Sequence, residues 1–162
     1  MKTNVYEIFD ESDLDKALKI VLSNFKTSEK NEYSKQGLAS ALTNLSQFDV
    51  FAPKSLFELV KNGVVSVFIT SDKSGTVAME KSTGRLLFLS AKSEKEYILL
   101  LEKIMEIRAD DPEGKLVLLA FLGQLNELKK IGFYKIYDTV FVKSGVKFVP
   151  LQFNYIQIDS EI

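Results

Sequence analysis

The side chains able to carry chemistry in this chain are carboxylates, lysines, tyrosines and hydroxyls, because its 162 residues include no histidine and no cysteine. Without histidine there is no serine–histidine relay and no imidazole metal ligand. Without cysteine there is no disulfide, thiolate nucleophile or thiolate zinc site. Any proton transfer must therefore use Asp, Glu, Lys, Tyr or water.

One acidic stretch, "RADDPEG", offers Asp110, Asp111 and Glu113 as ligands for a magnesium ion. Pro112 and Gly114 lie between two apolar segments, and this composition is more typical of a plain turn. We therefore expect neither a metal site nor a metal cofactor.

The stretch "LLFLSAKSEKEYILLLEKIM", residues 86–105, reads as a strand, a short loop and a long helix. Proteins often hold a phosphorylated cofactor at such a helix N-terminus, where backbone N–H groups are unpaired. Lys92 and Lys95 could attract a phosphate here, although they are equally consistent with a solvated turn. Ser93 and Glu96 have capping-box spacing, which predicts that the helix donors are already occupied by side chains.

Hydrophobic periodicity predicts the elements that position these residues. The expected helices span residues 11–25, 33–45, 55–62, 94–109 and 123–132. The expected strands span residues 64–71, 76–81, 85–91, 115–122, 134–143 and 146–158. The continuous apolar run of residues 115–122 indicates a parallel neighbour, reached from residues 85–91 by a right-handed crossover through the long helix.

Composition limits the classes of protein that fit. The chain is 46% hydrophobic with a formal net charge of −1, and its length suits one core, so we expect a single domain over residues 1–162. The balanced charge does not favour nucleic acid as a partner. No apolar run approaches the roughly 20 residues needed to cross a bilayer, and we expect no membrane association and a cytoplasmic location.

The order of these elements, with several local phrases, resembles the GNAT acyltransferase superfamily. The phrases are "LNELKKIGF", "GVKFVPLQF", "SNF…YSKQGLASAL" and "GRLLFLS". The resemblance implies an α+β fold: a mixed, mostly antiparallel twisted sheet of six or seven strands, with helices on both faces. It also implies that the strands at residues 85–91 and 115–122 splay apart and admit the pantetheine arm of acetyl-CoA.

The resemblance implies a set of cofactor-binding positions around this gap. They are Phe88, Leu89, Ser90, Lys92, Ser93, Lys95, Phe121 and Asn126. The loop "SAKSEKEY" departs from the family pattern because it has no glycine to let backbone N–H groups approach a pyrophosphate.

Catalytic candidates are fewer, because Leu128 stands where the family often has a tyrosine acid. Tyr134 and Tyr137 remain as acids and Glu80 as a base, acting directly or through water. Packing tyrosines in a strand and a solvated carboxylate at a strand end are the alternative interpretations of these three residues.

Two functions follow from the resemblance. One is an N-acyltransferase that uses acyl-CoA, with a divergent cofactor loop and an amine acceptor. The other is a catalytically inactive GNAT-shaped domain that serves as a binding or interaction module. An α+β domain of another family with a similar order of elements is a third alternative.

The apolar segment 146–158 further predicts a homodimer through the C-terminal hairpin, because Pro150 suggests an edge or a bulge.

Overall fold

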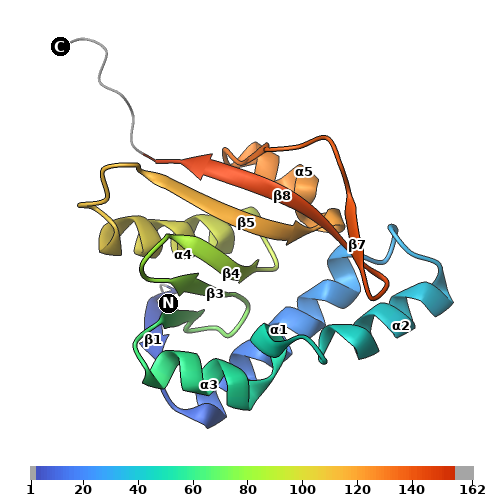
Figure 1. Ribbon diagram of the computed structural model, residues 1–162, viewed down its shortest axis with the longest axis horizontal. Helices are drawn as coiled ribbons and strands as arrows, with labels where there is room; N and C mark the ends of the chain where they lie inside the picture. The colour runs from blue at the N-terminus through green and yellow to red at the C-terminus, as the bar shows by residue number, and fades with distance from the viewer. Residues whose placement is uncertain (1–2, 156–162) are drawn as a thin grey trace.

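The computed structural model describes residues 3–155 and places its helices around a single sheet (Figure 1). The strands are β1 (Val5–Ile8), β2 (Val65–Thr70), β3 (Thr76–Glu80), β4 (Arg85–Ser90), β5 (Lys115–Phe121), β6 (Tyr134–Lys135), β7 (Phe141–Lys143) and β8 (Val146–Asn154). The helices are α1 (Glu11–Ser28), α2 (Lys35–Leu45), α3 (Pro53–Lys61), α4 (Glu94–Ile107) and α5 (Leu125–Lys130). Two 3₁₀ turns complete the list, η1 (Asp49–Phe51) and η2 (Leu122–Gln124).

The sheet has the strand order β1-β2-β3-β4-β5-β8-β6, with β7 also paired to β8. Every pairing is antiparallel except that of β4 with β5, which is parallel. The predicted α+β architecture and the predicted parallel pair are therefore confirmed. The sheet has eight strands rather than six or seven. The sequence pattern missed the four-residue β1, and the expected strand 134–143 divides into β6 and β7.

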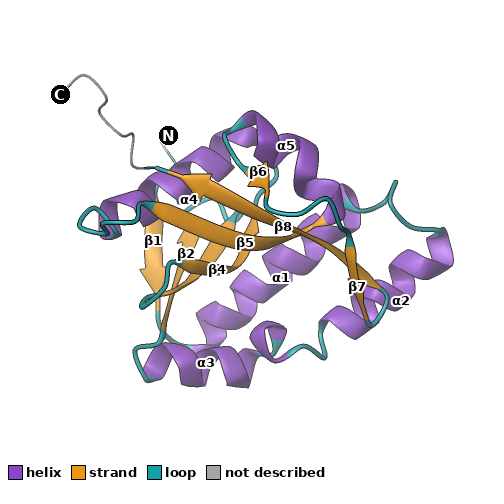
Figure 2. Cartoon of the chain, turned by 45° about the horizontal axis from the view of Figure 1, so that its top comes forward, coloured by secondary structure: helices purple, strands orange, loops and turns teal. Residues whose placement is uncertain are grey.

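Helices cover both faces of the sheet, as predicted (Figure 2). Alternate residues of a strand belong to two separate hydrophobic cores, because successive side chains of a strand point to opposite faces of the sheet. Val67 and Phe88 belong to the core under α1, α2 and α3. Phe68 and Leu89, their neighbours in sequence, belong to the core under α4 and α5. The sheet is thus a buried middle layer.

The C-terminal strand β8 lies inside the sheet, which corrects the reason given for a homodimer. It pairs with β5 on one side and with β6 and β7 on the other. Pro150 sits where β7 has ended and β6 has not begun, so its missing N–H breaks no ladder. Residues 156–158 of the predicted strand lie outside the described residues.

A homodimer stays a prediction, and β7 becomes its expected contact. Phe141 and Val142 are exposed on β7, which has no strand beyond it among residues 3–155. Apolar edge strands of this kind commonly pair with another chain. Light scattering is expected to return twice the chain mass, and Val142→Lys is expected to shift it to the monomer. A monomeric wild-type protein at high concentration would exclude the dimer.

Within residues 3–155, no helix combines the length and apolar character required to cross a lipid bilayer.

Candidate functional site

The site begins where β4 and β5 separate. The two strands pair only at Arg85 with Val117 and at Leu86 with Leu118. Beyond these residues the strands diverge, and within residues 3–155 the β4 edge from Leu87 onward has no partner strand on that side. The predicted splay is therefore present in the structure.

The side chain of Gln124, in the turn after β5, bridges this gap. Its Nε2 donates to the carbonyl oxygen of Leu89 on β4 at 2.7 Å, and its Oε1 accepts from the backbone N–H of Phe121 on β5 at 3.0 Å. Nε2 also donates to the hydroxyl of Tyr97 on α4 at 3.0 Å. The carboxamide of Gln124 thus links the edges of β4 and β5 by hydrogen bonds, as a backbone peptide group between two strands would.

Tyr97 supports this bridge from the other face of the sheet. Its side chain is buried in the core under α4, and burial raises the pKa of its hydroxyl to about 12. The group therefore stays protonated at neutral pH and is a poor proton donor to a thiolate. Its role is structural.

A buried carboxylate holds η2 in place. Glu29, at the end of α1, accepts from the backbone N–H of Gly123 at 2.8 Å and from the Ser28 hydroxyl at 2.7 Å. Glu29 is fully buried, and desolvation raises the pKa of its carboxyl above the ordinary value of 4.5. The end of α1 therefore fixes the turn that carries Gln124.

The raised pKa of Glu29 predicts a pH dependence of stability. The folded state binds more protons than the unfolded state between pH 4.5 and the raised pKa, so the free energy of unfolding falls as pH rises through that window. Glu29→Gln keeps an acceptor for Gly123 but does not titrate, so this fall should disappear. Denaturant midpoints measured from about pH 4 to about pH 8 test this, with the exposed Glu102→Gln as the control. Identical profiles for wild type and Glu29→Gln would contradict it.

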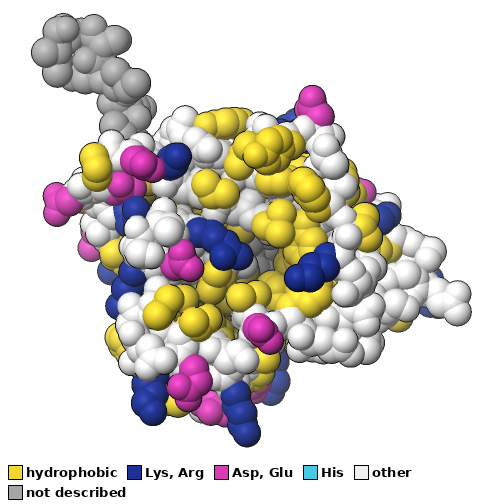
Figure 3. Space-filling model, viewed as in Figure 1, with side chains coloured by type: hydrophobic (Ala, Val, Ile, Leu, Met, Phe, Trp, Pro, Cys, Tyr) yellow, Lys and Arg dark blue, Asp and Glu magenta, His cyan; other side chains and the backbone are white. Residues whose placement is uncertain are grey.

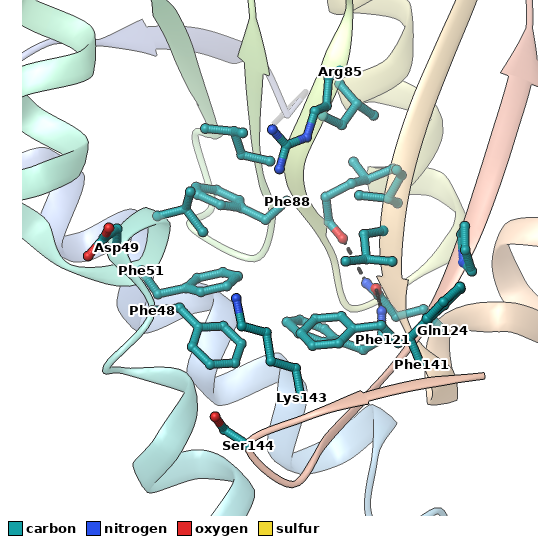
Figure 4. Close-up of a pocket in the computed structure, with 18 of the residues that line it drawn as sticks. Phe48, Asp49, Phe51, Arg85, Phe88, Phe121, Gln124, Phe141, Lys143 and Ser144 are labelled. Atoms are coloured by element: carbon teal, nitrogen blue, oxygen red, sulfur yellow. Dashed lines mark hydrogen bonds between the residues drawn. The ribbon is translucent and has the colours of Figure 1, made fainter. Parts of the chain in front are cut away.

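A cleft of about 1020 Å³ opens on the gap from the face that carries α1, α2 and α3. Its apolar lining comes from segments far apart in the chain, as Figure 4 shows. The phenylalanines that line it are Phe48, Phe51, Phe88, Phe121, Phe141 and Phe148. A cleft of this size accommodates a drug-sized molecule.

Two basic side chains, Arg85 from β4 and Lys143 from β7, also line the cleft and point into it (Figure 4). Both are exposed, and neither forms an ion pair within residues 3–155. Lys143 Nζ lies 5.3 Å from the centre of the Phe48 ring. In the space-filling view the hollow is apolar, with basic side chains on either side (Figure 3).

The predicted capping box at the start of α4 is wrong. Ser93 takes the N-cap position, but its side chain makes no capping hydrogen bond. No bond from Glu96 back to Ser93 exists either, among the side-chain hydrogen bonds of residues 3–155. The first-turn N–H groups of α4 are therefore free of side-chain caps and can donate to a phosphate.

The structure gathers some of the predicted cofactor-binding residues and separates others. Phe88, Leu89 and Phe121 line the cleft. Ser90 is buried beside it, where its hydroxyl accepts from Asn24 at 3.0 Å. Lys92, Ser93 and Lys95 lie together at the start of α4, outside the cleft lining. Asn126 is exposed on α5 and does not line the cleft.

The catalytic candidates also divide. Tyr137 lines the cleft and is 61% exposed. Glu80 accepts from the Thr83 hydroxyl at 2.7 Å in the turn between β3 and β4 and does not line the cleft. Tyr134 on β6 is also outside the lining, and its hydroxyl accepts from Asn154 at 3.1 Å.

Sequence reasoning missed Gln124, Arg85, Lys143 and the aromatic residues of the η1 segment. A helix start such as "GQLNEL" gives no sign that its glutamine turns back toward a strand. The spacing of phenylalanines in "FDVF" could have indicated an apolar surface, but not the strands that it faces.

The acidic turn after α4 holds no metal cluster. Asp111 accepts from the Arg108 guanidinium at 2.8 Å and from the Tyr155 hydroxyl at 3.0 Å. Across residues 3–155, no three His, Cys, Asp or Glu side chains gather closely enough to bind a metal ion.

Comparison with solved structures identifies the fold. The PaiA N-acetyltransferase of Thermoplasma acidophilum, solved with coenzyme A, superimposes with a TM-score of 0.66 at 16% identity, over 96% of this chain and all of that chain. A GCN5-related N-acetyltransferase of Rhodopseudomonas palustris gives 0.73 at 10% identity, over 96% of this chain and 97% of that one. FeeM, an N-acyl amino acid synthase from uncultured soil microbes, gives 0.61 at 11% identity, over 94% and 91%.

The chain therefore has the fold of the GNAT N-acetyltransferases, as its sequence predicts. At the level of sequence, no family model and no characterised protein matches it.

Proposed function

We propose that the chain is an N-acyltransferase that uses an acyl-CoA, and that its amine acceptor binds in the aromatic cleft. The observation that carries the proposal is the divergence of β4 and β5 directly above this cleft. The fold supports it, since the similar structures include N-acetyltransferases, one of them in complex with coenzyme A.

The residues around the gap fit a coenzyme A molecule. The unpaired β4 edge offers backbone groups to the amides of the pantetheine arm, as a neighbouring strand would. The uncapped first turn of α4 offers N–H donors to the pyrophosphate, and Lys92 and Lys95 add positive charge. The loop still lacks glycine, so we expect pyrophosphate binding to depend on Lys92 and Lys95.

The reaction follows from this arrangement. Acyl-CoA supplies the thioester carbonyl. The acceptor nitrogen attacks the carbonyl carbon, the C–N bond forms and the C–S bond breaks, and an amine proton passes to the departing sulfur to give an amide and a thiol. Of the three catalytic candidates, Tyr137 is the best placed to relay that proton, because it lines the cleft: its phenol gives a proton to the sulfur and takes up the amine proton in return.

The alternative is a GNAT-shaped binding module without activity. It is favoured by the Gln124 bridge, which already fills the hydrogen-bonding positions of Leu89 and Phe121, and by the loop without glycine. Both functions are consistent with a single domain in the cytoplasm without nucleic acid, which stays a prediction from composition.

Calorimetric titration separates the two functions. We expect acetyl-CoA to bind with a dissociation constant of about 1–100 µM, and a pantetheine fragment to bind more weakly. Lys92→Ala/Lys95→Ala should weaken acetyl-CoA binding about tenfold and leave pantetheine binding unchanged, because the lysines contact only the phosphates.

The matched control is Lys129→Ala/Lys130→Ala, at exposed positions near the end of α5, which should change neither affinity. If acetyl-CoA fails to bind at millimolar concentration, the transferase proposal is wrong and the binding module stands.

A further inference from the structure

We infer that the acceptor is an amino acid with a large apolar side chain, whose free carboxylate pairs with Arg85 and Lys143. This inference rests on the proposed acyltransferase function for the role of the amine. Its binding part rests on the cleft alone.

The floor of the cleft is a closed array of phenyl rings. Phe48, Phe51, Phe121 and Phe148 follow one another with ring centroids 6.3, 6.1, 5.7 and 6.1 Å apart around the cycle. Phe88 adds a fifth ring, 5.9 Å from Phe51. None of these side chains offers a hydrogen bond, so the part of the ligand against them must be apolar. Rings at these separations suit an aromatic or branched body.

The charge lining the cleft is positive. Arg85 and Lys143 point into the cavity from opposite sides, whereas Asp49 points away from it (Figure 4). No carboxylate of residues 3–155 forms an ion pair with either cation. Since both cations border the apolar floor, the ligand they fit is an anion joined to an apolar body, and a carboxylate matches the planar guanidinium.

The same charges help the amine to react. A protonated amine in this cleft would lie near two cations, which favour its neutral form and lower its pKa. The free amine is the form that attacks a thioester. The cleft can therefore prepare the nucleophile by its electrostatic field.

A matched pair of ligands tests the binding part by calorimetry. Wild-type protein should bind 3-phenylpropionate at least about tenfold more tightly than 3-phenylpropionamide, which has the same shape without the charge. Propionate, which lacks the apolar body, should bind far more weakly than either. Arg85→Gln and Lys143→Gln should each remove most of the acid-over-amide preference, while Lys129→Gln should leave it intact.

Circular dichroism of each variant shows whether the fold persists, and both basic residues are exposed, so their loss should not unfold the chain. Equal affinity for the acid and the amide in wild type would overturn the inference. So would an acid preference that survives in the Arg85→Gln/Lys143→Gln double variant.

A transfer assay then separates this inference from the proposed function. With acetyl-CoA, thiol release should be at least about tenfold faster in kcat/KM with phenylalanine than with phenethylamine, which lacks the carboxylate. If phenethylamine reacts equally well, the transferase stands and the carboxylate inference fails. If the acid preference in binding holds but no amine releases thiol, the carboxylate site stands and the transferase proposal fails.

Discussion

Gln124→Ala is expected to lower the free energy of unfolding by about 3–6 kcal/mol, because three buried polar groups each lose a hydrogen bond and each loss typically costs about 1–3 kcal/mol. These groups are the Leu89 carbonyl, the Phe121 N–H and the Tyr97 hydroxyl. Water that enters from the cleft offsets part of the cost. Chemical denaturation of the variant beside wild type measures the change.

The same substitution should raise the affinity for a pantetheine fragment, by about tenfold. The carboxamide of Gln124 competes with the ligand's amides for the β4 edge, and alanine removes that competitor. Lower stability with higher affinity is therefore the expected combination. If the inactive-module alternative is correct, stability falls but pantetheine binds neither protein.

Gln36→Ala, on the exposed surface of α2, is the matched control and should change neither quantity. A Gln124→Ala variant as stable as wild type would show that the bridge contributes nothing to folding. A variant that binds pantetheine more weakly than wild type would instead make Gln124 part of the ligand site.

Much of the fold could be predicted from local pattern, because the pattern and the tertiary environment agree. The long helix α4 shows this, since its 3.6-residue periodicity places Leu101 and Ile104 in the core where they are buried. Ile98 is 41% exposed, whereas its neighbour Tyr97 is 3% exposed, so the buried face of α4 takes in Tyr97 and leaves Ile98 on its margin. The continuous apolar strand β5 was correctly predicted to have a parallel neighbour.

The site was less predictable, since its decisive contacts join residues far apart in the chain. Gln124 meets Leu89 across 35 residues, and Glu29 meets Gly123 across 94. The hydrophobic periodicity of a sequence contains no information on which distant residues form such contacts. Ser93 and Glu96 show the opposite case. Both residues of a capping box are present at the right spacing, yet the Ser93 hydroxyl makes no capping hydrogen bond. A spacing that permits a hydrogen bond does not require it.

Gly123, which precedes Gln124, packs closely against the end of α1. Gly123→Ala is expected to lower the free energy of unfolding by about 2.5–6 kcal/mol, from about 1–3 kcal/mol for overpacking and about 1.5–3 kcal/mol for the lost hydrogen bond to a charged group. An added Cβ would overlap the backbone carbonyl oxygen of Ser28 and the carboxylate of Glu29. The turn must then move away from the end of α1, and Gln124 must move with it.

A second variant distinguishes this steric cause from loss of the carboxylate contact. Glu29→Ala removes the side chain but leaves the Ser28 carbonyl in place, so Glu29→Ala/Gly123→Ala should remain less stable than Glu29→Ala alone. The displaced turn should also reduce the preference for 3-phenylpropionate over 3-phenylpropionamide, but by less than Arg85→Gln does. Arg85 lies on β4 and not on η2, so it does not move with the turn. Chemical denaturation of the three variants measures the first comparison. A Gly123→Ala protein of wild-type stability would show that η2 does not need its close packing against α1.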